Sequence, residues 1–299
     1  MIKMNYYEDY INILGNNSWL NLDSYDNILS DDIIFELNCA IRRGTKVIRI
    51  KDYMHSIDKL SELNGLDILC IEKYENDIIK LPSNLKMLII GDFSKNMINL
   101  PDSIEVILLG SKFDSFFKKW PKNLKKLKIT YKINQLLDNL PDGLEILIIG
   151  GLFNYRLDNL PKTLKKLDFV GLSEFNQPLD NLPDGLVKLR VSGIFNQSLD
   201  FLPIGLKSLY ITSKFNSLLD NLPEDLRELS FSSLAMFNND INNLPDTIEI
   251  LELPLCYYLK VRRFPKNLRK LRASMKFLIE NRELLKKYPD IEYPNEIEI

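Results

Sequence analysis

The stretch FNQPLDNLPDGLVKLRVSGIFNQSLDFLPIGLKSLYITSKFN, residues 175–216, contains nearly the same twenty-residue unit twice. A Leu-Pro step or a variant of it marks the period, and a Leu or Ile stands at the third and sixth positions after each proline. Ten prolines recur at spacings of 19 to 22 residues: Pro82, Pro101, Pro121, Pro141, Pro161, Pro183, Pro203, Pro223, Pro245 and Pro265. Self-similarity at this period predicts stacked coils, each burying its leucines against its neighbours.

Twenty residues are too few for a strand, a full helix and two connections. They suffice for one short strand, a turn and an extended return. The pattern L-x-x-L-x-[IVLF] predicts the strand, because its second and third apolar residues then point to the same side. Proline cannot donate a hydrogen bond to a strand ladder, so the Leu-Pro step belongs to the return segment.

An aromatic residue followed by Asn ends most units. We expect the aromatic rings to stack as a spine through the coils, at Phe153, Phe175, Phe195, Phe215 and Phe237. The amides that follow should bond to adjacent coils at a buried turn, at Asn154, Asn176, Asn196, Asn216 and Asn238, because buried backbone groups need partners.

The unit FNQPLDNLPDGLVKL resembles the FNIP repeat, a leucine-rich-repeat variant known from amoebae and from giant viruses that infect them. The resemblance covers about residues 63–277 and implies an interaction protein without a common enzymatic activity. We therefore expect an α/β repeat solenoid: a leucine-rich-repeat-like right-handed coil, one parallel β-sheet of about 12 short strands, and helical caps at both ends.

The ends of the chain differ from the repeats. SDDIIFELNCAIRRG, residues 30–44, predicts a capped helix over about 30–43, with Ser30 as N-cap and Gly44 as the stop. KFLIENRELLKKY, residues 276–288, predicts a second helix that covers the last coil. The predicted parts are an N-terminal cap at 1–44, the solenoid at 45–274, and a capping helix with a tail at 275–299.

Composition excludes several classes of protein. The chain has 299 residues, a formal net charge of −2 and 45% hydrophobic residues, which is typical of a folded protein without a general attraction to nucleic acid. No run of eighteen apolar residues is present, so we expect no membrane span. The start does not read as a signal peptide, and three widely spaced cysteines predict reduced thiols and a cytoplasmic location, in the host if the protein is viral.

Catalysis has little support in the sequence, and we expect no enzyme and no cofactor. His55 is the sole histidine and lies in a connecting loop, where an exposed structural role is expected. Cys39 could act as a nucleophile, but it falls inside the expected capping helix. A recurring aspartate could bind calcium, although bonds to backbone N–H groups of its own turn are favoured, at Asp138, Asp158, Asp180, Asp200 and Asp220. No metal site is predicted.

The strand face that points away from the leucines is the expected binding surface. Several early strands are apolar on both faces, which is typical of a covered sheet. The partner-binding residues predicted on this face are Ile68, Met87, Ile89, Val106, Leu108, Lys126, Lys128, Ile146, Ile148, Lys188, Arg190 and Tyr210, and Cys70 lies among the apolar ones. Three covers remain open for the apolar patch: a partner protein, a second copy of the chain, or residues 1–29.

We expect a non-enzymatic scaffold that binds a protein partner on its concave strand face. An adaptor whose N-terminal region recruits other machinery, for example a ubiquitin ligase, is the alternative, and a self-associating structural protein is the third. Lysines and arginines of the strand face could also bind phosphates, but interspersed acids favour a solvated surface over nucleic-acid binding.

Overall fold

The structure is a computed structural model, and it describes residues 19–22, 28–97, 99–110, 113, 117–130, 136–212 and 214–292. Contacts within the chain divide it into two compact units, Met1–Gln135 and Leu136–Ile299. The predicted division at residues 44 and 274 remains a prediction, because the two units follow from contacts and the predicted parts from repeat boundaries.

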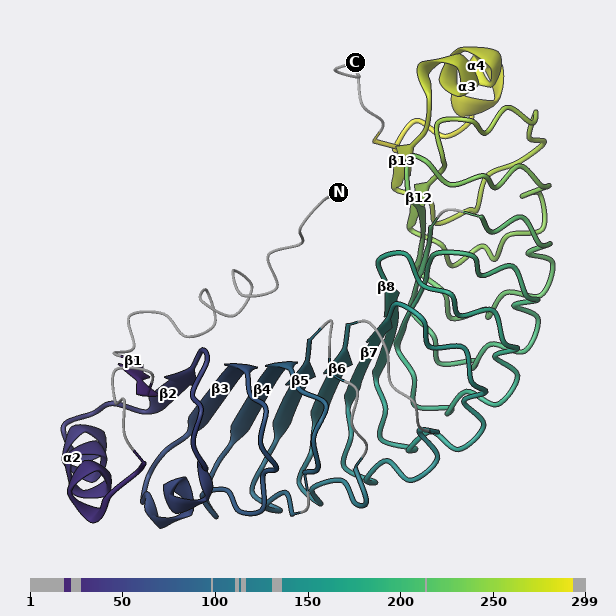
Figure 1. Cartoon of the computed structure of the whole chain (residues 1–299). Helices are drawn as coiled ribbons and strands as arrows, with labels where there is room; N and C mark the ends of the chain where they lie inside the picture. Colours follow the sequence, from purple (N-terminus) through teal and green to yellow (C-terminus); the bar gives the residue numbers. More distant parts are fainter. Residues whose placement is uncertain are drawn as a thin grey trace. The chain divides into compact units, whose positions relative to one another are not determined.

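Thirteen short strands are present in the described residues, each parallel to the strands with which it pairs (Figure 1). The first unit holds β1 Trp19–Asn21, β2 Val47–Ile50, β3 Ile68–Lys73, β4 Met87–Asp92, β5 Val106–Leu109 and β6 Lys126–Ile129. The second unit holds β7 Ile146–Gly150, β8 Lys166–Val170, β9 Lys188–Val191, β10 Ser208–Ile211, β11 Glu228–Phe231, β12 Ile250–Glu252 and β13 Lys270–Arg272. The predicted parallel β-solenoid is confirmed, and β1 is an additional strand that no motif indicated.

Each repeat proline lies outside the strands, as predicted, and closes a turn that leads into the next strand. Its carbonyl oxygen accepts a hydrogen bond from the backbone N–H three residues later, as in the 3.0 Å bond from Leu186 to Pro183. The leucine of that bond is fully buried, and so is Leu189 at the second position of the strand. The conserved spacing of proline and leucine within this chain therefore encodes the turn as well as the core.

The aromatic spine is confirmed in the second unit. Ring centroids of successive coils lie 6.0–6.3 Å apart from Phe153 to Tyr257, and the rings are nearly parallel. Paired strands are separated by about 4.8 Å. Because the rings are spaced more widely than the strands, the coils of this unit fan outward, and the strand face lies on the inside of the curve.

The amide ladder is also present, but it lies at the surface. Asn196 Oδ1 accepts the backbone N–H of Asn216 at 2.7 Å, and Asn216 Oδ1 accepts that of Asn238 at 2.9 Å. Asn196 and Asn216 are exposed rather than buried. The prediction of a buried turn was wrong, because the spine fills the interior and leaves the following residue at its edge. The expected loss on truncating one amide is correspondingly smaller.

A short helix is present near each end of the described chain. Helix α2, Asp31–Arg42, begins after Ser30, whose side chain accepts the N–H of Ile33 as an N-cap. The second predicted helix is divided into α3, Met275–Glu280, and α4, Arg282–Leu285. The break lies at the buried Asn281, which donates to the carbonyl of Phe277 and accepts from the N–H of Val261 in the preceding coil.

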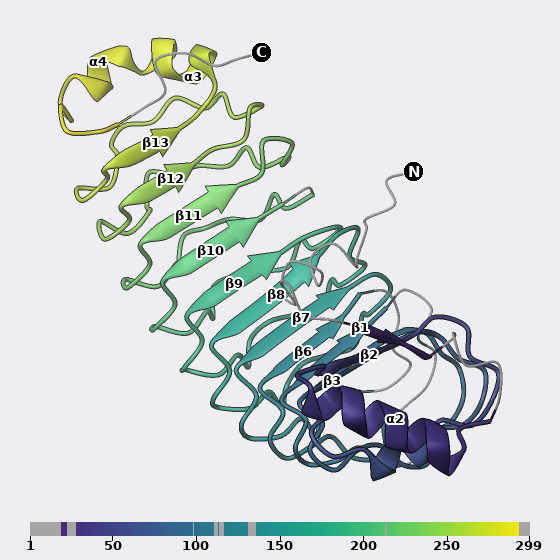
Figure 2. The same cartoon turned by 90° about the vertical axis from the view of Figure 1, so that its left-hand side faces the viewer.

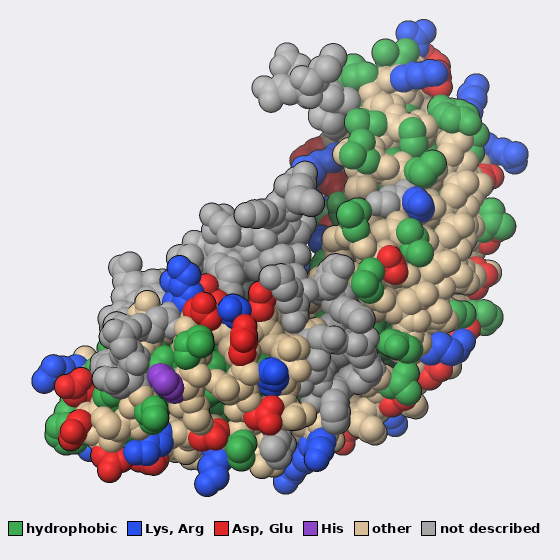
Figure 3. All heavy atoms as spheres, in the orientation of Figure 1, with side chains coloured by type: hydrophobic (Ala, Val, Ile, Leu, Met, Phe, Trp, Pro, Cys, Tyr) green, Lys and Arg blue, Asp and Glu red, His purple; other side chains and the backbone are tan. Residues whose placement is uncertain are grey.

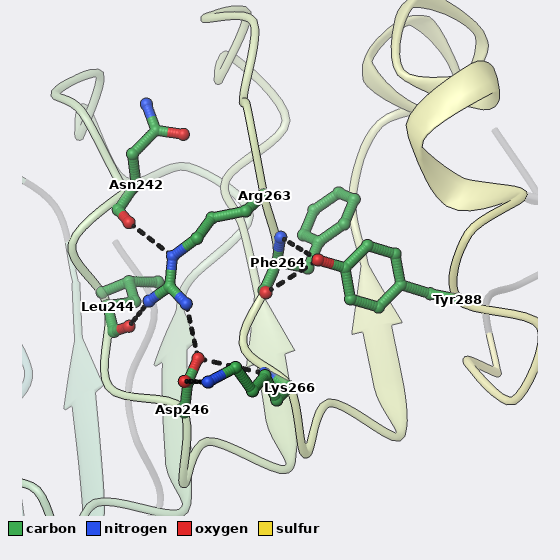
Figure 4. Close-up of polar contacts among 7 residues, drawn as sticks. All are labelled: Asn242, Leu244, Asp246, Arg263, Phe264, Lys266 and Tyr288. Carbon is green, nitrogen blue, oxygen red and sulfur yellow. Dashed lines mark hydrogen bonds and ion pairs between the residues drawn. The ribbon is translucent and has the colours of Figure 1, made fainter.

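Polar contacts tie the last coils of the second unit together (Figure 4). The Arg263 guanidinium donates to the carbonyls of Asn242 and Leu244 and pairs with the carboxylate of Asp246 at 2.5 Å. Lys266 binds the same carboxylate at 2.8 Å. With the Arg263 guanidinium beside it, the Lys266 ammonium lowers the pKa of Asp246 to about 2. These contacts join two successive coils.

Within the residues described, no helix is long and apolar enough to cross a membrane.

Candidate binding surface on the strand faces

Two rows of side chains line the strand face of each unit. The register aligns Ile68, Met87, Val106 and Lys126 in the first row of the first unit, and Cys70, Ile89, Leu108 and Lys128 in its second row. The alternate strand residues point to the opposite side, where they form the leucine core. The predicted assignment of these eight residues to one face is therefore confirmed.

The apolar part of the first unit's face is not a bare patch. Cys70, Met87, Ile89 and Leu108 form a cluster with exposed fractions of 1%, 8%, 4% and 2%, and Ile68 and Val106 pack against them. Burial also raises the pKa of the Cys70 thiol to about 12, as expected for an inert buried cysteine. The covered sheet that the sequence indicated is therefore present in the chain by itself, and these side chains have little surface left for the predicted contact with a partner.

This burial is a property of one chain by itself. Neither a partner protein nor a second copy is needed to shield the cluster. Residues 1–18 and 23–27, most of the third cover that the sequence left open, lie outside the described residues. We call Cys70, Met87, Ile89 and Leu108 the covered cluster.

The second unit's strand face is largely polar, and we call it the open face because Lys188 and Arg190 are exposed there. Figure 2 shows its parallel strands β9 to β13 side by side. Its first row holds Ile146, Lys166, Lys188, Ser208, Glu228, Ile250 and Lys270, and its second row holds Ile148, Asp168, Arg190, Tyr210, Ser230, Glu252 and Arg272. Lys188 and Arg190 are exposed, whereas Ile146, Ile148 and Tyr210 are half-buried. These five predicted site residues therefore share one accessible face.

Every carboxylate of the open face already has a partner. Asp168 pairs with Lys166 of the same strand at 2.9 Å. Glu228 accepts a hydrogen bond of 2.9 Å from the Ser208 hydroxyl. Glu252 pairs with Arg272 at 2.6 Å. The acidic groups of this face are thus used within the chain.

Three of its five cations have no such partner. Among the described residues, no carboxylate lies within ion-pairing distance of Lys188, Arg190 or Lys270. Arg190 instead stacks on the Tyr210 ring, with its guanidinium carbon 4.4 Å from the ring centroid. Stacking of this kind holds a guanidinium in place without neutralising it. The charged groups of the open face that remain available to a ligand are therefore positive.

One buried hydroxyl on the second row has no hydrogen-bond partner in the described part of the chain. Ser230 is 2% exposed, and its Oγ neither donates nor accepts. It lies between Tyr210 and Glu252 in the register. Sequence reasoning missed this residue, because a serine on an alternating strand reads as an exposed position.

Hydrophobic side chains are also exposed beyond the strand ends of the second unit, and Figure 3 shows green side chains at several places on one face of this unit. Leu172 is 91% exposed and Leu234 is 83% exposed. The sequence analysis did not single them out, because each follows its strand by only a few residues and resembles a continuation of it.

The residues considered for chemistry do not form a reactive site. His55 is half-buried rather than exposed, with its ring against Tyr53. Cys39 lies in α2 and is a free thiol. No group of three or more His, Cys, Asp or Glu side chains that could hold a metal ion occurs in the part of the chain that is described.

The recurring aspartates bind side chains of the next coil, and Asp158 and Asp200 also bind Arg156 and Ser198 of their own turns. Asp158, Asp200 and Asp220 accept hydrogen bonds from the side-chain amides of Asn181, Asn221 and Asn243, at 3.0 to 3.1 Å. The expectation that they bind backbone N–H groups of their own turn was wrong for these three, because an Asn one coil later reaches the carboxylate. Asp180 has Phe201 at the corresponding place, which offers no donor.

Glycines after the strands serve coil packing rather than access for a partner. Gly193 has a φ of +69°, and a Cβ there would lie 1.8 Å from the carbonyl oxygen of Ser173. A Cβ at Gly110 would lie 2.8 Å from the Cα of Gly91. The absence of a side chain at these positions lets adjacent coils approach.

Comparisons with known proteins identify the architecture. No family model and no curated protein matches the chain. Five chains of solved structures match, among them one described as "The crystal structure of CroV588 a novel circular LRR protein structure". The two share 25% identity and a TM-score of 0.68 over 77% of this chain and 40% of that one, so this chain matches less than half of that protein's length. The likeness shows that the chain has a leucine-rich-repeat-like solenoid fold.

Proposed function

We propose that this protein is a non-enzymatic scaffold that binds a protein partner on the open strand face of its second unit. The observation that carries the proposal is the set of unpaired cations at Lys188, Arg190 and Lys270 on a face whose carboxylates are all engaged. Solenoids of this kind commonly bind proteins on their extended curved surfaces. Tyr210 and the half-buried Ile146 and Ile148 supply apolar contact beside the charges.

The covered cluster is not the proposed binding surface. Met87, Ile89, Val106 and Leu108 are among the partner-binding residues that the sequence predicts. Three of these side chains are at most 8% exposed, so they offer a partner little surface. We therefore assign partner binding to the second unit in the resting chain.

Two finer assignments belong to the same proposal. The FNIP repeat class is supported by the recurring Phe-Asn and Leu-Pro pairs, whose rings, amides and turns have the roles described above. A cytoplasmic location is supported by three free cysteines. An adaptor would use the same face to select its target and would differ in what residues 1–44 recruit.

Site-specific photo-crosslinking tests the proposal. Benzoylphenylalanine at Ser208, in the first row of the open face, should give crosslinked partner protein in an extract of the native cells. The matched control is the same group at Phe201, which is exposed on a return segment outside the strands. Adducts from position 201 alone, or from neither position, would reject the proposal.

A further inference from the structure

We propose that the open face binds an extended acidic segment of its partner, with two carboxylates at alternate positions pairing with Lys188 and Arg190. This inference rests on the proposed function and specifies the chemistry of the partner.

Charge complementarity carries the first step. The two rows of the second unit present five cations and three carboxylates from β8 to β13. The carboxylates are engaged within the chain, whereas Lys188 and Arg190 have no ion pair there and are exposed. A ligand that brings carboxylates gains two ion pairs without first breaking any in the protein.

Strand geometry carries the second step. Lys188 and Arg190 are alternate residues of β9, so both side chains point to the same face, about 6.6–6.8 Å apart along the strand. Alternate residues of an extended ligand have the same spacing. A segment that lies along β9 with an acidic residue at positions i and i+2 therefore reaches both cations at once.

The Tyr210 ring carries the third step. Its contact with the Arg190 guanidinium fixes one of the two cations before a ligand arrives. A positioned guanidinium loses less side-chain freedom on pairing than a mobile one, and its planar donor pattern matches a carboxylate. Lys188 has no such contact and acts as a point charge.

An acidic polypeptide fits this face better than a nucleic acid. A phosphate chain laid across the strands would meet Asp168, Glu228 and Glu252, which lie on the same two rows as the cations. Repulsion from these carboxylates opposes a continuous line of phosphates. A peptide that lies along β9 can place its two charged residues over Lys188 and Arg190 without crossing the strands that carry these carboxylates.

Fluorescence polarisation with a labelled ten-residue peptide of alternating Glu and Thr tests the proposal on the full chain. The wild type should bind this peptide, and Lys188→Glu with Arg190→Glu should weaken binding about tenfold or more. Arg190→Lys keeps the charge but loses the planar contact, and should weaken binding about two- to threefold. The same peptide with Gln in place of Glu should not bind.

The matched control reverses two charges elsewhere. Lys162→Glu with Lys260→Glu changes the net charge by the same amount at exposed positions outside the strands, and should leave binding within about twofold of the wild type. Circular dichroism and a thermal melt establish that each variant is folded.

Three results overturn the proposal: no binding of the acidic peptide by the wild type, equal loss in the two double variants, or tighter binding of a ten-nucleotide single-stranded DNA through Lys188 and Arg190. If position 208 still crosslinks a protein while the acidic peptide fails to bind, the scaffold function stands and only its ligand chemistry is wrong. Absence of both signals rejects both.

Discussion

The strand faces of the two units are built by the same repeat but meet solvent differently. In the first unit, the second row holds Cys70 on β3, Ile89 on β4 and Leu108 on β5, and all three are buried. In the second unit, Arg190 and Tyr210 occupy the corresponding register on β9 and β10, and they remain accessible. The repeat therefore fixes which way a side chain points, but it does not decide whether that side chain meets solvent.

The closed face should be the more sensitive to a buried charge. Ile89→Asp is expected to destabilise the protein by about 4 kcal/mol or more, because a carboxylate would be buried without a partner. Ile148→Asp, on the half-buried second row of the other unit, should cost about 1–2 kcal/mol. Urea unfolding of both variants measures the difference. Similar losses would show that the two faces are equally accessible.

Thiol labelling probes the same contrast without changing the covered side chain. With Cys39 replaced by serine, the exposed Cys256 should react rapidly with a disulfide reagent, and Cys70 should react at least about 100-fold more slowly. Burial limits the access of the reagent to the Cys70 thiol. The raised pKa also lowers the fraction of this thiol that is ionised and reactive. Equal rates for the two thiols in the native protein would mean that the cluster is not covered.

Polar contacts between coils stabilise the second unit, and Asp246, which pairs with Arg263 and Lys266, is the clearest titrating example. Its pKa is lowered to about 2 in the folded protein, so its contribution is present above its ordinary pKa of 3.8 and is lost as the pH falls towards 2. Asp246→Asn should lower the Tm by a few degrees at pH 7, and the gap to the wild type should close between about pH 5 and pH 2.

Glu280→Gln provides the control for this pH dependence, since Glu280 is an exposed acid of the same unit. Its melting curve should follow that of the wild type over the same range. A gap for Asp246→Asn that stays constant with pH would contradict the assignment of the charge effect to this carboxylate.

The amide ladder should contribute a smaller amount per coil. Asn196→Ala removes the acceptor for the N–H of Asn216 at the surface, where water can replace it, and should cost about 0.5–1.5 kcal/mol. Asn196→Asp keeps the acceptor and should remain near the wild type at pH 7. A loss of about 3 kcal/mol for the alanine variant would show that the ladder is shielded from water after all.

The smallest effect is expected at the unpartnered hydroxyl of the open face. Ser230→Ala removes a buried group without a hydrogen bond and should be neutral or stabilise by up to about 1 kcal/mol. Ser173→Ala is the matched control, because its buried Oγ accepts the N–H of Phe175 at 3.2 Å and its loss should destabilise. Equal destabilisation by both changes would show that Ser230 has a partner.

The sequence determined the architecture because each coil repeats the same residue pattern. Proline and leucine at fixed spacing specify the turn and the core, and Phe195 and its equivalents specify the spine. The alternation of residues along a strand specifies the two faces, so the sequence alone places Lys188, Arg190 and Tyr210 on one surface. The turn, the core, the spine and the two faces depend only on residues nearby in the chain or on the equivalent residues of the next coil.

Only the tertiary structure decided what each face and side chain meets. The burial of Cys70 and Leu108, the break at Asn281 and the bonds from Asn181 and Asn221 to aspartates one coil earlier all depend on residues brought together by the fold. Periodicity gives the direction of a side chain but not the group that lies opposite it. The cations of the open face are free because the fold pairs each carboxylate beside them with another residue of the chain.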